Sequence, residues 1–217
     1  MSAAASDRRG REIRVKICGI TRLADAQLAV DLGADALGFN FWPRSHRYCD
    51  PAVARQIIRK LPPLVTAVAV FVNQSRQEID RICSAVYPNA LQLHGNESPE
   101  FCQGFQWPVI KAIPVKGPES LRACEAYRVS AFLMDTPSRS FGGSGRTFPW
   151  KLLAAWADSR PILLAGGLTA ENVRRAVQLV RPYGVDVASG VESAPGIKSP
   201  KKMARFIAAA KRALLES

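Results

Sequence analysis

Short apolar segments alternate along the chain with longer stretches whose apolar residues recur every three or four positions. The first pattern is typical of buried strands, and the second is typical of helices with one buried face. Strands that each lead into a helix are expected to lie parallel in one sheet. We predict eight such strands, at residues 14–18, 36–41, 66–71, 90–93, 109–113, 132–135, 162–165 and 185–187.

Most of the helical stretches begin with a recognisable start signal. Asp50 and Ser199 each precede a proline, and Ser75 is followed three residues later by Glu78, as in a capping box. Eight helices are expected, starting near Thr21, Asp50, Ser75, Ser98, Gly117, Pro149, Thr169 and Ser199. Residues 98–127 have the least regular pattern, so the fifth helix is expected to be short or replaced by an irregular connection.

The predicted strands recur along the chain without a linker or a change in composition between them, so one domain accounts for all of them. Eight βα units of this size close into a (β/α)8 TIM barrel, a fold of the α/β class. We expect residues 13–217 to form this barrel and residues 1–12 to be a flexible basic leader. An open doubly wound sheet is the structural alternative, but no GxGxxG or GxxxxGK[ST] motif follows the first strand.

The cysteines and the apolar runs limit the class of protein. There are five cysteines, with no CxxC pair and no closely spaced histidine. Neither a disulfide framework nor a metal site is therefore expected. We expect the protein to be located in the reducing cytoplasm. The longest apolar run, residues 65–72, is far shorter than the roughly 20 residues that span a bilayer, so no membrane segment is expected.

The chain is strongly basic, with 30 Lys and Arg against 18 Asp and Glu residues and a net charge of +12. Much of the excess lies near the two ends of the sequence, where a solvated basic face is the simplest explanation. Such a charge also suits a nucleic-acid surface or a field that attracts a small anionic substrate. Because the aromatic residues fall mainly in predicted core and barrel-mouth positions, we place a non-catalytic nucleic-acid-binding protein below an enzyme.

In a parallel barrel, the residues at the carboxyl ends of the strands build the active site. The first strand ends at Cys18, and its alternation places Lys16 and Cys18 on the same face. A cysteine taken alone at such a position is usually a small buried apolar residue, so the other strand ends must support a chemical role for Cys18. Asp135 ends the sixth strand, where its carboxyl group either transfers a proton or caps the loop that follows.

Glycines after the seventh and eighth strands predict a phosphate site. Gly166 and Gly167 follow one strand, and Ser189 and Gly190 follow the next, just after Asp186. Glycine lets backbone N–H groups approach an anion, and barrels usually bind phosphate at these two loops. Each glycine pair alone is a weak signal, but the two together favour a phosphate cup.

Three further groups complete the candidate site. The loop after Asp135 is long and contains Gly142 and Gly143, which suggests a lid or a contact to the phosphate. Arg47, after the second strand, is placed to bind a carboxylate through two hydrogen bonds, beside aromatic residues that suit a flat ring. His94 is either a proton shuttle or a hydrogen-bonded residue at a strand end.

Six stretches of the sequence together resemble the phosphoribosylanthranilate isomerases of tryptophan biosynthesis. They are VKICGIT from Val15, GADALGFNFWPRSHRY from Gly33, LQLHGNE from Leu91, FLMDT from Phe132 with GGSGRTFPW from Gly142, LLAGGLTAENV from Leu163 and GVDVASGVESAPGIK from Gly184. The resemblance implies an Amadori rearrangement of N-(5-phosphoribosyl)anthranilate to 1-(2-carboxyphenylamino)-1-deoxyribulose 5-phosphate, without cofactor or metal. It implies a cytoplasmic monomer or homodimer that binds this small anionic phosphorylated substrate, and neither nucleic acid nor a membrane.

The same resemblance implies roles for individual residues. Asp135 matches the general acid, Cys18 the general base, and Arg47 the contact to the anthranilate carboxylate. We expect Lys16 to lower the pKa of the Cys18 thiol, so that part of it is thiolate. The remaining substrate-binding assignments are His94, Gly142, Gly143, Gly166, Gly167, Asp186, Ser189 and Gly190.

Departures and alternatives remain. Asn40, Trp42 and Thr169 differ from the residues usual in the family, which leaves the shape of the anthranilate pocket less defined than the reaction. The nearest enzymatic alternative is the histidine-pathway isomerase, which performs the same rearrangement and typically uses two aspartates. Cys18 at the first strand end argues against that alternative.

Overall fold

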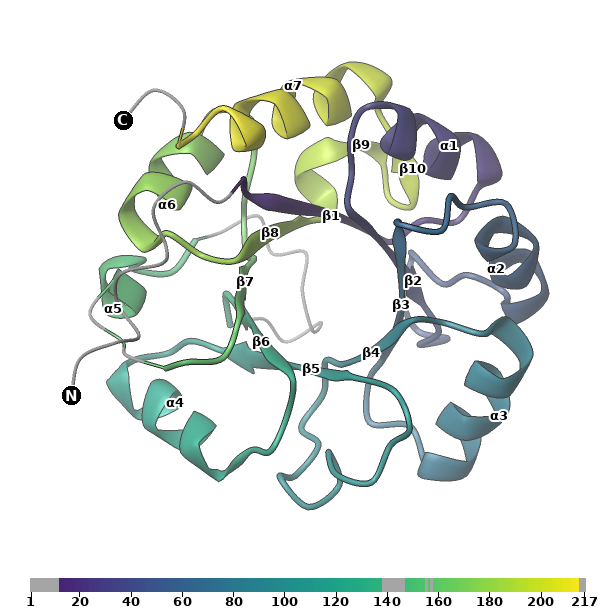
Figure 1. The fold of residues 1–217 in the computed structure, drawn as a ribbon, viewed down its shortest axis with the longest axis horizontal. Helices are drawn as coiled ribbons and strands as arrows, with labels where there is room; N and C mark the ends of the chain where they lie inside the picture. Colours follow the sequence, from purple (N-terminus) through teal and green to yellow (C-terminus); the bar gives the residue numbers. More distant parts are fainter. Residues whose placement is uncertain (1–11, 138–146, 155, 157, 215–217) are drawn as a thin grey trace.

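Eight parallel strands, taken in the order of the sequence, form a closed barrel, and β8 pairs back with β1. The computed structural model describes residues 12–137, 147–154, 156 and 158–214 of the chain. The strands are β1 (Arg14–Cys18), β2 (Ala36–Asn40), β3 (Thr66–Phe71), β4 (Ala90–Leu93), β5 (Val109–Pro114), β6 (Ala131–Asp135), β7 (Ile162–Leu164) and β8 (Gly184–Val187). Figure 1 looks down this ring of strands. The predicted (β/α)8 fold is confirmed, and so are all eight strands, each end to within one residue.

Helices surround the barrel in the described part of the chain. They are α1 (Leu23–Asp31), α2 (Pro51–Ile58), α3 (Arg76–Val86), α4 (Pro118–Arg122), α5 (Lys151–Ala154), α6 (Val173–Val180) and α7 (Pro200–Lys211). The helix predicted at Ser98 is absent, because residues 94–108 between β4 and β5 form turns (Figure 1). The expected irregularity of residues 98–127 is confirmed, since α4 is short and runs into a 3-10 helix, η1 (Ala123–Ala126).

Three helix starts are capped as the sequence predicts. The side chain of Asp50 accepts a hydrogen bond from Ala52 N at 2.8 Å. Ser75 accepts one from Glu78 N at 3.2 Å, and Ser199 begins α7 in the same way. Each of these caps satisfies a backbone N–H that the first helical turn leaves without a partner.

The predictions at Thr21 and Thr169 are wrong. Helix α1 begins at Leu23, and Thr21 Oγ1 instead donates to the backbone oxygen of Gly196 at 2.7 Å. Helix α6 begins at Val173, because Thr169 N donates to the side chain of Asn172 at 2.9 Å and a turn precedes the helix. In both cases a nearby polar partner competes with the helix for the threonine.

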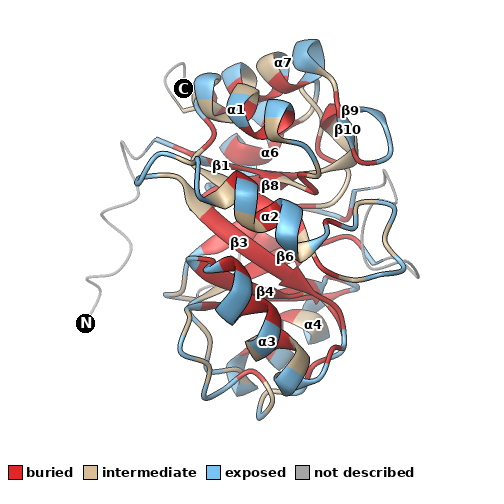
Figure 2. Ribbon diagram, turned by 90° about the vertical axis from the view of Figure 1, so that its right-hand side faces the viewer, coloured by how far each residue is buried: buried red, intermediate tan, exposed pale blue. Residues whose placement is uncertain are grey.

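The core has two layers, one on each face of the barrel wall. The larger layer lies between the strands and the surrounding helices, and Figure 2 shows the strands almost entirely buried. The smaller layer fills the barrel interior with side chains such as Val68, Val70 and Leu133. Buried polar side chains, described below, interrupt this interior. The site is therefore built on the rigid wall of the barrel.

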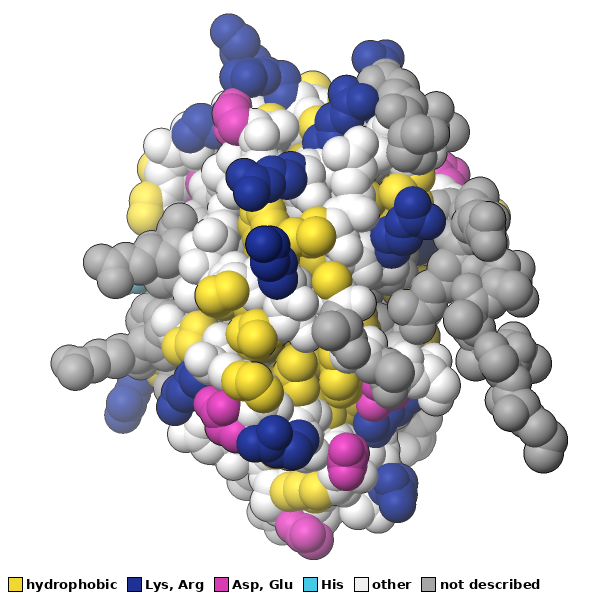
Figure 3. All heavy atoms as spheres, turned by 90° about the vertical axis from the view of Figure 1, so that its left-hand side faces the viewer, with side chains coloured by type: hydrophobic (Ala, Val, Ile, Leu, Met, Phe, Trp, Pro, Cys, Tyr) yellow, Lys and Arg dark blue, Asp and Glu magenta, His cyan; other side chains and the backbone are white. Residues whose placement is uncertain are grey.

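One face of the barrel mixes charged and apolar side chains. Figure 3 shows the face that carries α5 and α6, where Lys and Arg side chains are interspersed with apolar and acidic ones. The described Lys and Arg side chains on this face are scattered, rather than gathered in the continuous basic stripe that is typical of a nucleic-acid-binding surface. Among the described residues, no helix is both long and apolar enough to cross a bilayer.

The division into a leader and a barrel stays a prediction. Residues 1–11 and 215–217 lie outside the described residues. Glu12, the last residue assigned to the leader, forms an ion pair with Lys211 of α7, with 3.1 Å between Glu12 Oε1 and Lys211 Nζ. The described chain is thus tied to the barrel from residue 12 onward.

Candidate active site

One cavity at the carboxyl ends of the strands is lined by every described residue of the predicted site. Two predicted residues, Gly142 and Gly143, lie outside the described residues. The residues that strand ends and the family resemblance indicated thus lie together at the mouth of the barrel. The predicted residues that line the cavity are Cys18, Arg47, His94, Asp135, Gly166, Gly167, Asp186, Ser189 and Gly190.

Cys18 and Lys16 share the inner face of β1, as predicted, and Gly38 of β2 makes room for both. Gly38 is in register with Cys18 on the neighbouring strand. A Cβ atom at this glycine would lie 2.8 Å from Cys18 Sγ and 3.1 Å from Lys16 Nζ. Any larger residue would therefore push the thiol or the ammonium out of place.

Lys16 is buried, with 1% of its surface exposed, and is held by two acceptors. Its Nζ donates to Asp186 Oδ1 at 2.6 Å and to Gln92 Oε1 at 2.9 Å. Burial opposes the charge of the ammonium, but Asp186 and Cys18 together outweigh it and hold the pKa of Lys16 above its usual value. A fixed positive charge therefore lies beneath the Cys18 thiol.

The pKa of Cys18 differs from the expectation. Burial raises the pKa of the thiol, and the Asp186 carboxylate raises it further. Lys16 lowers it, as predicted, but the net pKa lies above that of an ordinary cysteine. The predicted sign of the Lys16 contribution is thus confirmed, while the expected thiolate is not favoured near neutral pH.

Asp135 is held at both of its carboxyl oxygens. Its Oδ1 accepts a hydrogen bond from Thr136 N at 2.7 Å, and its Oδ2 lies 3.1 Å from His94 Nε2. The other ring nitrogen of His94 lies 2.6 Å from the side-chain nitrogen of Gln92. The structure thus places His94 as a hydrogen-bonded residue at a strand end that touches the candidate acid.

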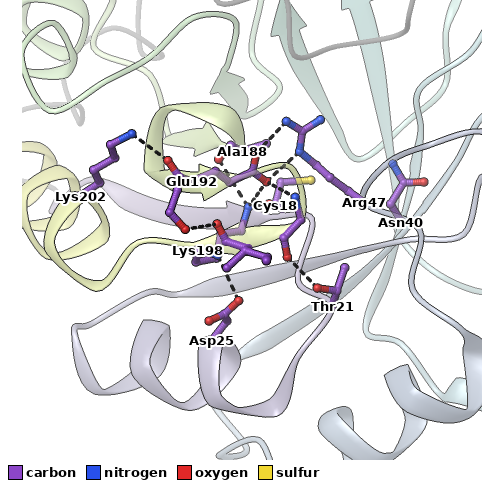
Figure 4. A network of polar contacts seen from close by, with 12 residues as sticks. Cys18, Thr21, Asp25, Asn40, Arg47, Ala188, Glu192, Lys198 and Lys202 are labelled. Atoms are coloured by element: carbon purple, nitrogen blue, oxygen red, sulfur yellow. Dashed lines mark hydrogen bonds and ion pairs between the residues drawn. The ribbon is translucent and has the colours of Figure 1, made fainter.

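Arg47 meets an internal carboxylate at the cavity mouth (Figure 4). Its Nε and Nη2 donate to the two carboxylate oxygens of Glu192 at 2.8 and 2.7 Å. This pair raises the pKa of Arg47 above its usual value. Gly19, with a left-handed φ of +75°, lets the Arg47 side chain pass close to the backbone, because a Cβ at this position would lie 2.6 Å from Arg47 Cδ. The guanidinium is therefore already oriented for a carboxylate.

Lys198 ties the ends of two strands together beneath Arg47 (Figure 4). It lies on β10 (Ile197–Lys198), which pairs with β9 (Glu192–Ala194). Its Nζ donates to Glu192 Oε1 at 2.9 Å and to the backbone oxygen of Cys18 at 2.5 Å. Burial lowers the pKa of Lys198, although Glu192 opposes this. The ammonium thus fixes both Glu192 and the end of β1.

The glycine turns after β7 and β8 form one wall of the cavity. Gly166 and Gly167 have left-handed φ values of +82° and +63°, which only glycine adopts without strain. Gly190 lies in the 3-10 helix η2 (Ser189–Val191), and a Cβ there would collide with the backbone oxygen of Leu168. Because α6 begins only at Val173, a turn separates its N-terminus from Gly167.

The sequence reasoning missed Gln92 and Lys198. Gln92 had a signal, since it is a polar residue in the middle of the apolar strand β4. Lys198 had no comparable signal, because its contact to the end of the first strand joins residues 180 positions apart in the sequence. Among the described residues, no group of three or more metal-ligating side chains occurs.

Comparison with known proteins places the chain in a family. The family profile for N-(5′-phosphoribosyl)anthranilate (PRA) isomerase matches residues 15–209. The N-(5′-phosphoribosyl)anthranilate isomerase of Pelobacter propionicus is 51% identical over 206 residues, which cover 94% of this chain and 99% of that protein. The isomerase of Myxococcus xanthus is 48% identical over 204 residues, covering 92% of this chain and 96% of that protein.

Solved structures agree with the sequence comparison. The phosphoribosylanthranilate isomerase of Thermotoga maritima has a TM-score of 0.87 and 46% identity, covering 92% of this chain and 98% of that one. A phosphoribosylanthranilate isomerase in complex with reduced 1-(o-carboxyphenylamino)-1-deoxyribulose 5-phosphate has a TM-score of 0.84 and 44% identity, with the same coverage. This chain belongs to the N-(5′-phosphoribosyl)anthranilate isomerase family.

Proposed function

We propose that this chain converts N-(5-phosphoribosyl)anthranilate to 1-(2-carboxyphenylamino)-1-deoxyribulose 5-phosphate by general acid–base catalysis. One observation carries the proposal: Cys18 and Asp135, a base and an acid on different strands, line the same cavity as Arg47 and the glycine turns. The cavity thus combines groups for proton transfer with groups for a carboxylate and a phosphate. The similar structure with bound reduced product analogue supports this substrate class.

The first chemical step is opening of the ribose ring. Asp135 donates a proton to the ring oxygen as the bond between this oxygen and C1 breaks, and the amine nitrogen supplies electrons to form a Schiff base. Both oxygens of Asp135 are held by hydrogen bonds, so its carboxyl group has one fixed orientation. Such a fixed acid loses little free energy to reorientation in the transition state.

The second step is removal of the proton at C2. The Cys18 thiolate takes this proton, and the released electron pair forms an enolamine, which tautomerises to the ketone as O2 loses a proton and C1 gains one. The raised pKa of Cys18 reduces the thiolate fraction near neutral pH. The same shift makes the thiolate a stronger base once it forms.

The remaining residues bind the substrate. Arg47 binds the anthranilate carboxylate, and backbone N–H groups around Gly166, Gly167, Ser189 and Gly190 bind the phosphate. His94 and Asp186 line the same cavity, and the lid role of Gly142 and Gly143 is part of the proposal. The net charge of +12 favours approach of this substrate, which carries both a phosphate and a carboxylate.

The assembly is proposed to be a monomer or a homodimer. One similar Thermotoga maritima structure is described as monomers generated from a dimeric phosphoribosylanthranilate isomerase, and it is 43% identical to this chain with a TM-score of 0.83. Light scattering across a concentration series distinguishes the two states. A mass that stays at 23.6 kDa at every concentration would exclude the homodimer.

The test compares turnover of N-(5-phosphoribosyl)anthranilate, generated in situ and followed by fluorescence, for the wild type, Cys18→Ala and Asp135→Asn. We expect rapid loss of substrate with the wild type and a collapse of turnover in both variants, which still bind the reduced product analogue. Absence of turnover by well-folded wild type would overturn the proposal, and the histidine-pathway substrate would be assayed next. Equal activity of either variant would remove that residue from the mechanism.

A further inference from the structure

A continuous row of polar contacts crosses the barrel from β8 to β6. The Asp186 carboxylate accepts from Lys16, Lys16 donates to Gln92, Gln92 contacts His94, and His94 contacts Asp135. The successive distances are 2.6, 2.9, 2.6 and 3.1 Å. The row ends on the carboxyl group that the proposed function uses as its acid.

The chemistry of Lys16 decides how the Gln92 amide lies. An ammonium group has only donors, so the atom of Gln92 that faces Lys16 Nζ is its oxygen. The amide nitrogen of Gln92 therefore faces His94 Nδ1 at 2.6 Å. Since Gln92 is fully buried, with no exposed surface, its amide has no water partner that would allow the opposite orientation.

This orientation decides the tautomer of His94. The Gln92 amide nitrogen has only donors, so His94 Nδ1 must accept with its lone pair. The proton of the neutral ring then lies on Nε2, from which it donates to Asp135 Oδ2. The ammonium of Lys16 thus determines the orientation of the Gln92 amide and the tautomer of His94, and so the direction of the hydrogen bond between His94 and Asp135.

We propose that Gln92 is a positioning residue that fixes His94 as the Nε2–H tautomer and thereby orients the Asp135 carboxyl group. The inference rests on the proposed function for the role of Asp135. With Nδ1 occupied by Gln92 and Nε2 carrying a proton, the ring has no free lone pair to take the acidic proton of Asp135. That proton is therefore delivered to the substrate.

Two substitutions at Gln92 test the direction of the hydrogen bonds. Gln92→Met keeps the length of the side chain and removes both the acceptor for Lys16 and the donor to His94, so the tautomer is no longer fixed. Gln92→Glu offers His94 a carboxylate, which only accepts when ionised, so Nδ1 becomes the protonated nitrogen. The first variant should give a mixture of tautomers, and the second should reverse the wild-type tautomer.

Long-range proton–nitrogen NMR of protein labelled with nitrogen-15 in histidine reads the tautomer directly. The chain has two histidines, and the exposed His46 serves as an internal reference. Gln74→Met is a matched control, because it removes another buried glutamine amide, which bonds to Phe41 and Glu78 rather than to His94. We expect the Nε2–H tautomer in the wild type and in this control.

Kinetics provide a second readout. We expect Gln92→Met to lower kcat about tenfold, the size expected when the one hydrogen bond that orients Asp135 is weakened, with KM nearly unchanged. An Nδ1–H tautomer in the wild type, or an unchanged tautomer in Gln92→Glu, would overturn the proposal without reference to activity. If the tautomers behave as expected while the wild type does not turn over substrate, the proposed function fails and the fixing of His94 by Gln92 stands.

Discussion

The guanidinium of Arg47 holds the carboxylate of Glu192 through two hydrogen bonds of 2.8 and 2.7 Å at the mouth of the barrel. Burial would raise the pKa of Glu192, but Arg47 and Lys198 together hold it below its usual value. An ionised side chain of the protein thus occupies two of the donors of Arg47. A substrate carboxylate must use the remaining donors or displace Glu192.

We therefore expect Arg47→Met to weaken substrate binding more than it slows the chemical step. Loss of charge-assisted hydrogen bonds is worth about 1.5–3 kcal/mol, so KM should rise about 10-fold to 150-fold. Steady-state kinetics and titration with the reduced product analogue measure the effect. Arg44→Met, at an exposed position of the same loop, is the control. Equal effects of the two substitutions would contradict a specific contact to Arg47.

The space at Gly38 leads to a second prediction. Gly38→Ala would place a methyl group 2.8 Å from Cys18 Sγ and 3.1 Å from Lys16 Nζ. Displacing a reacting group by about 1 Å costs about 100-fold in rate, so we expect a loss of kcat of this order while the product analogue still binds. Turnover and calorimetric titration provide the two measurements. Unchanged kcat in a folded variant would show that the thiol has room to shift without consequence.

The raised pKa of Cys18 predicts how its reactivity depends on pH. The wild-type thiol should react with iodoacetamide with a midpoint above the value of about 8.5 for a free cysteine. Lys16→Met removes the charge that lowers the pKa, so the midpoint should move still higher. Mass spectrometry of digested protein resolves Cys18 from the other four cysteines, which are all buried: Cys49, Cys83, Cys102 and Cys124.

The control for this measurement is Lys116→Met, which removes an exposed lysine. Its midpoint should match that of the wild type. A lower midpoint in Lys16→Met than in the wild type would contradict the assigned sign. A midpoint of the wild type below 8.5, about the value of a free thiol, would mean that burial does not dominate at Cys18.

Asp35 predicts a pH-dependent part of the stability. Burial alone would raise its pKa, but hydrogen bonds from Lys211, Val15 N and Arg14 hold it below its usual value. A lowered pKa in the folded state stabilises the protein above the unfolded value of about 3.9, and this stability is lost as the pH falls through the folded pKa.

We therefore expect Asp35→Asn to lower the free energy of unfolding at pH 7 by about 1 kcal/mol, because the carboxylate is partly solvated. The difference from the wild type should begin to shrink below about pH 4, where Asp35 of the unfolded chain becomes protonated, and should disappear once the pH falls below the lowered pKa of the folded state. Urea unfolding of the wild type and of Asp35→Asn at a series of pH values measures this difference in the free energy of unfolding. A difference that stays constant between pH 7 and about pH 3 would show that Asp35→Asn destabilises the protein for a reason other than the loss of the carboxylate charge.

Local patterns in the sequence predict the barrel wall and the position of the cavity. Strand alternation places Lys16 and Cys18 on one face, and strand ends locate Asp135, because both follow from the geometry of a single strand. The contacts of Gln92 and Lys198 depend on the register of several strands, which no single segment specifies. The net pKa of Cys18 depends on burial by the whole barrel, so its direction was also beyond the sequence.

The missing helix between β4 and β5 has a physical replacement. Lys111 of β5 donates to the backbone oxygens of Leu93 and Gly95 at 3.2 and 2.7 Å and to Glu97 Oε2 at 2.8 Å. Glu97 in turn accepts from Asn73 N and Gly95 N. This buried ion pair satisfies the polar groups of a turn, where the capping signal at Ser98 had predicted a helix.

The last prediction tests this replacement by a double-mutant cycle. Lys111→Met leaves the buried Glu97 carboxylate without its cation, so the free energy of unfolding should fall by about 3–5 kcal/mol. Adding Glu97→Gln removes the uncompensated charge and should recover part of the loss, because the amide oxygen still accepts from Asn73 N and Gly95 N. Urea unfolding of the two single variants and the double variant measures the coupling. If the losses of the two single variants simply add, Lys111 and Glu97 are not coupled, and the ion pair does not account for the stability of this turn.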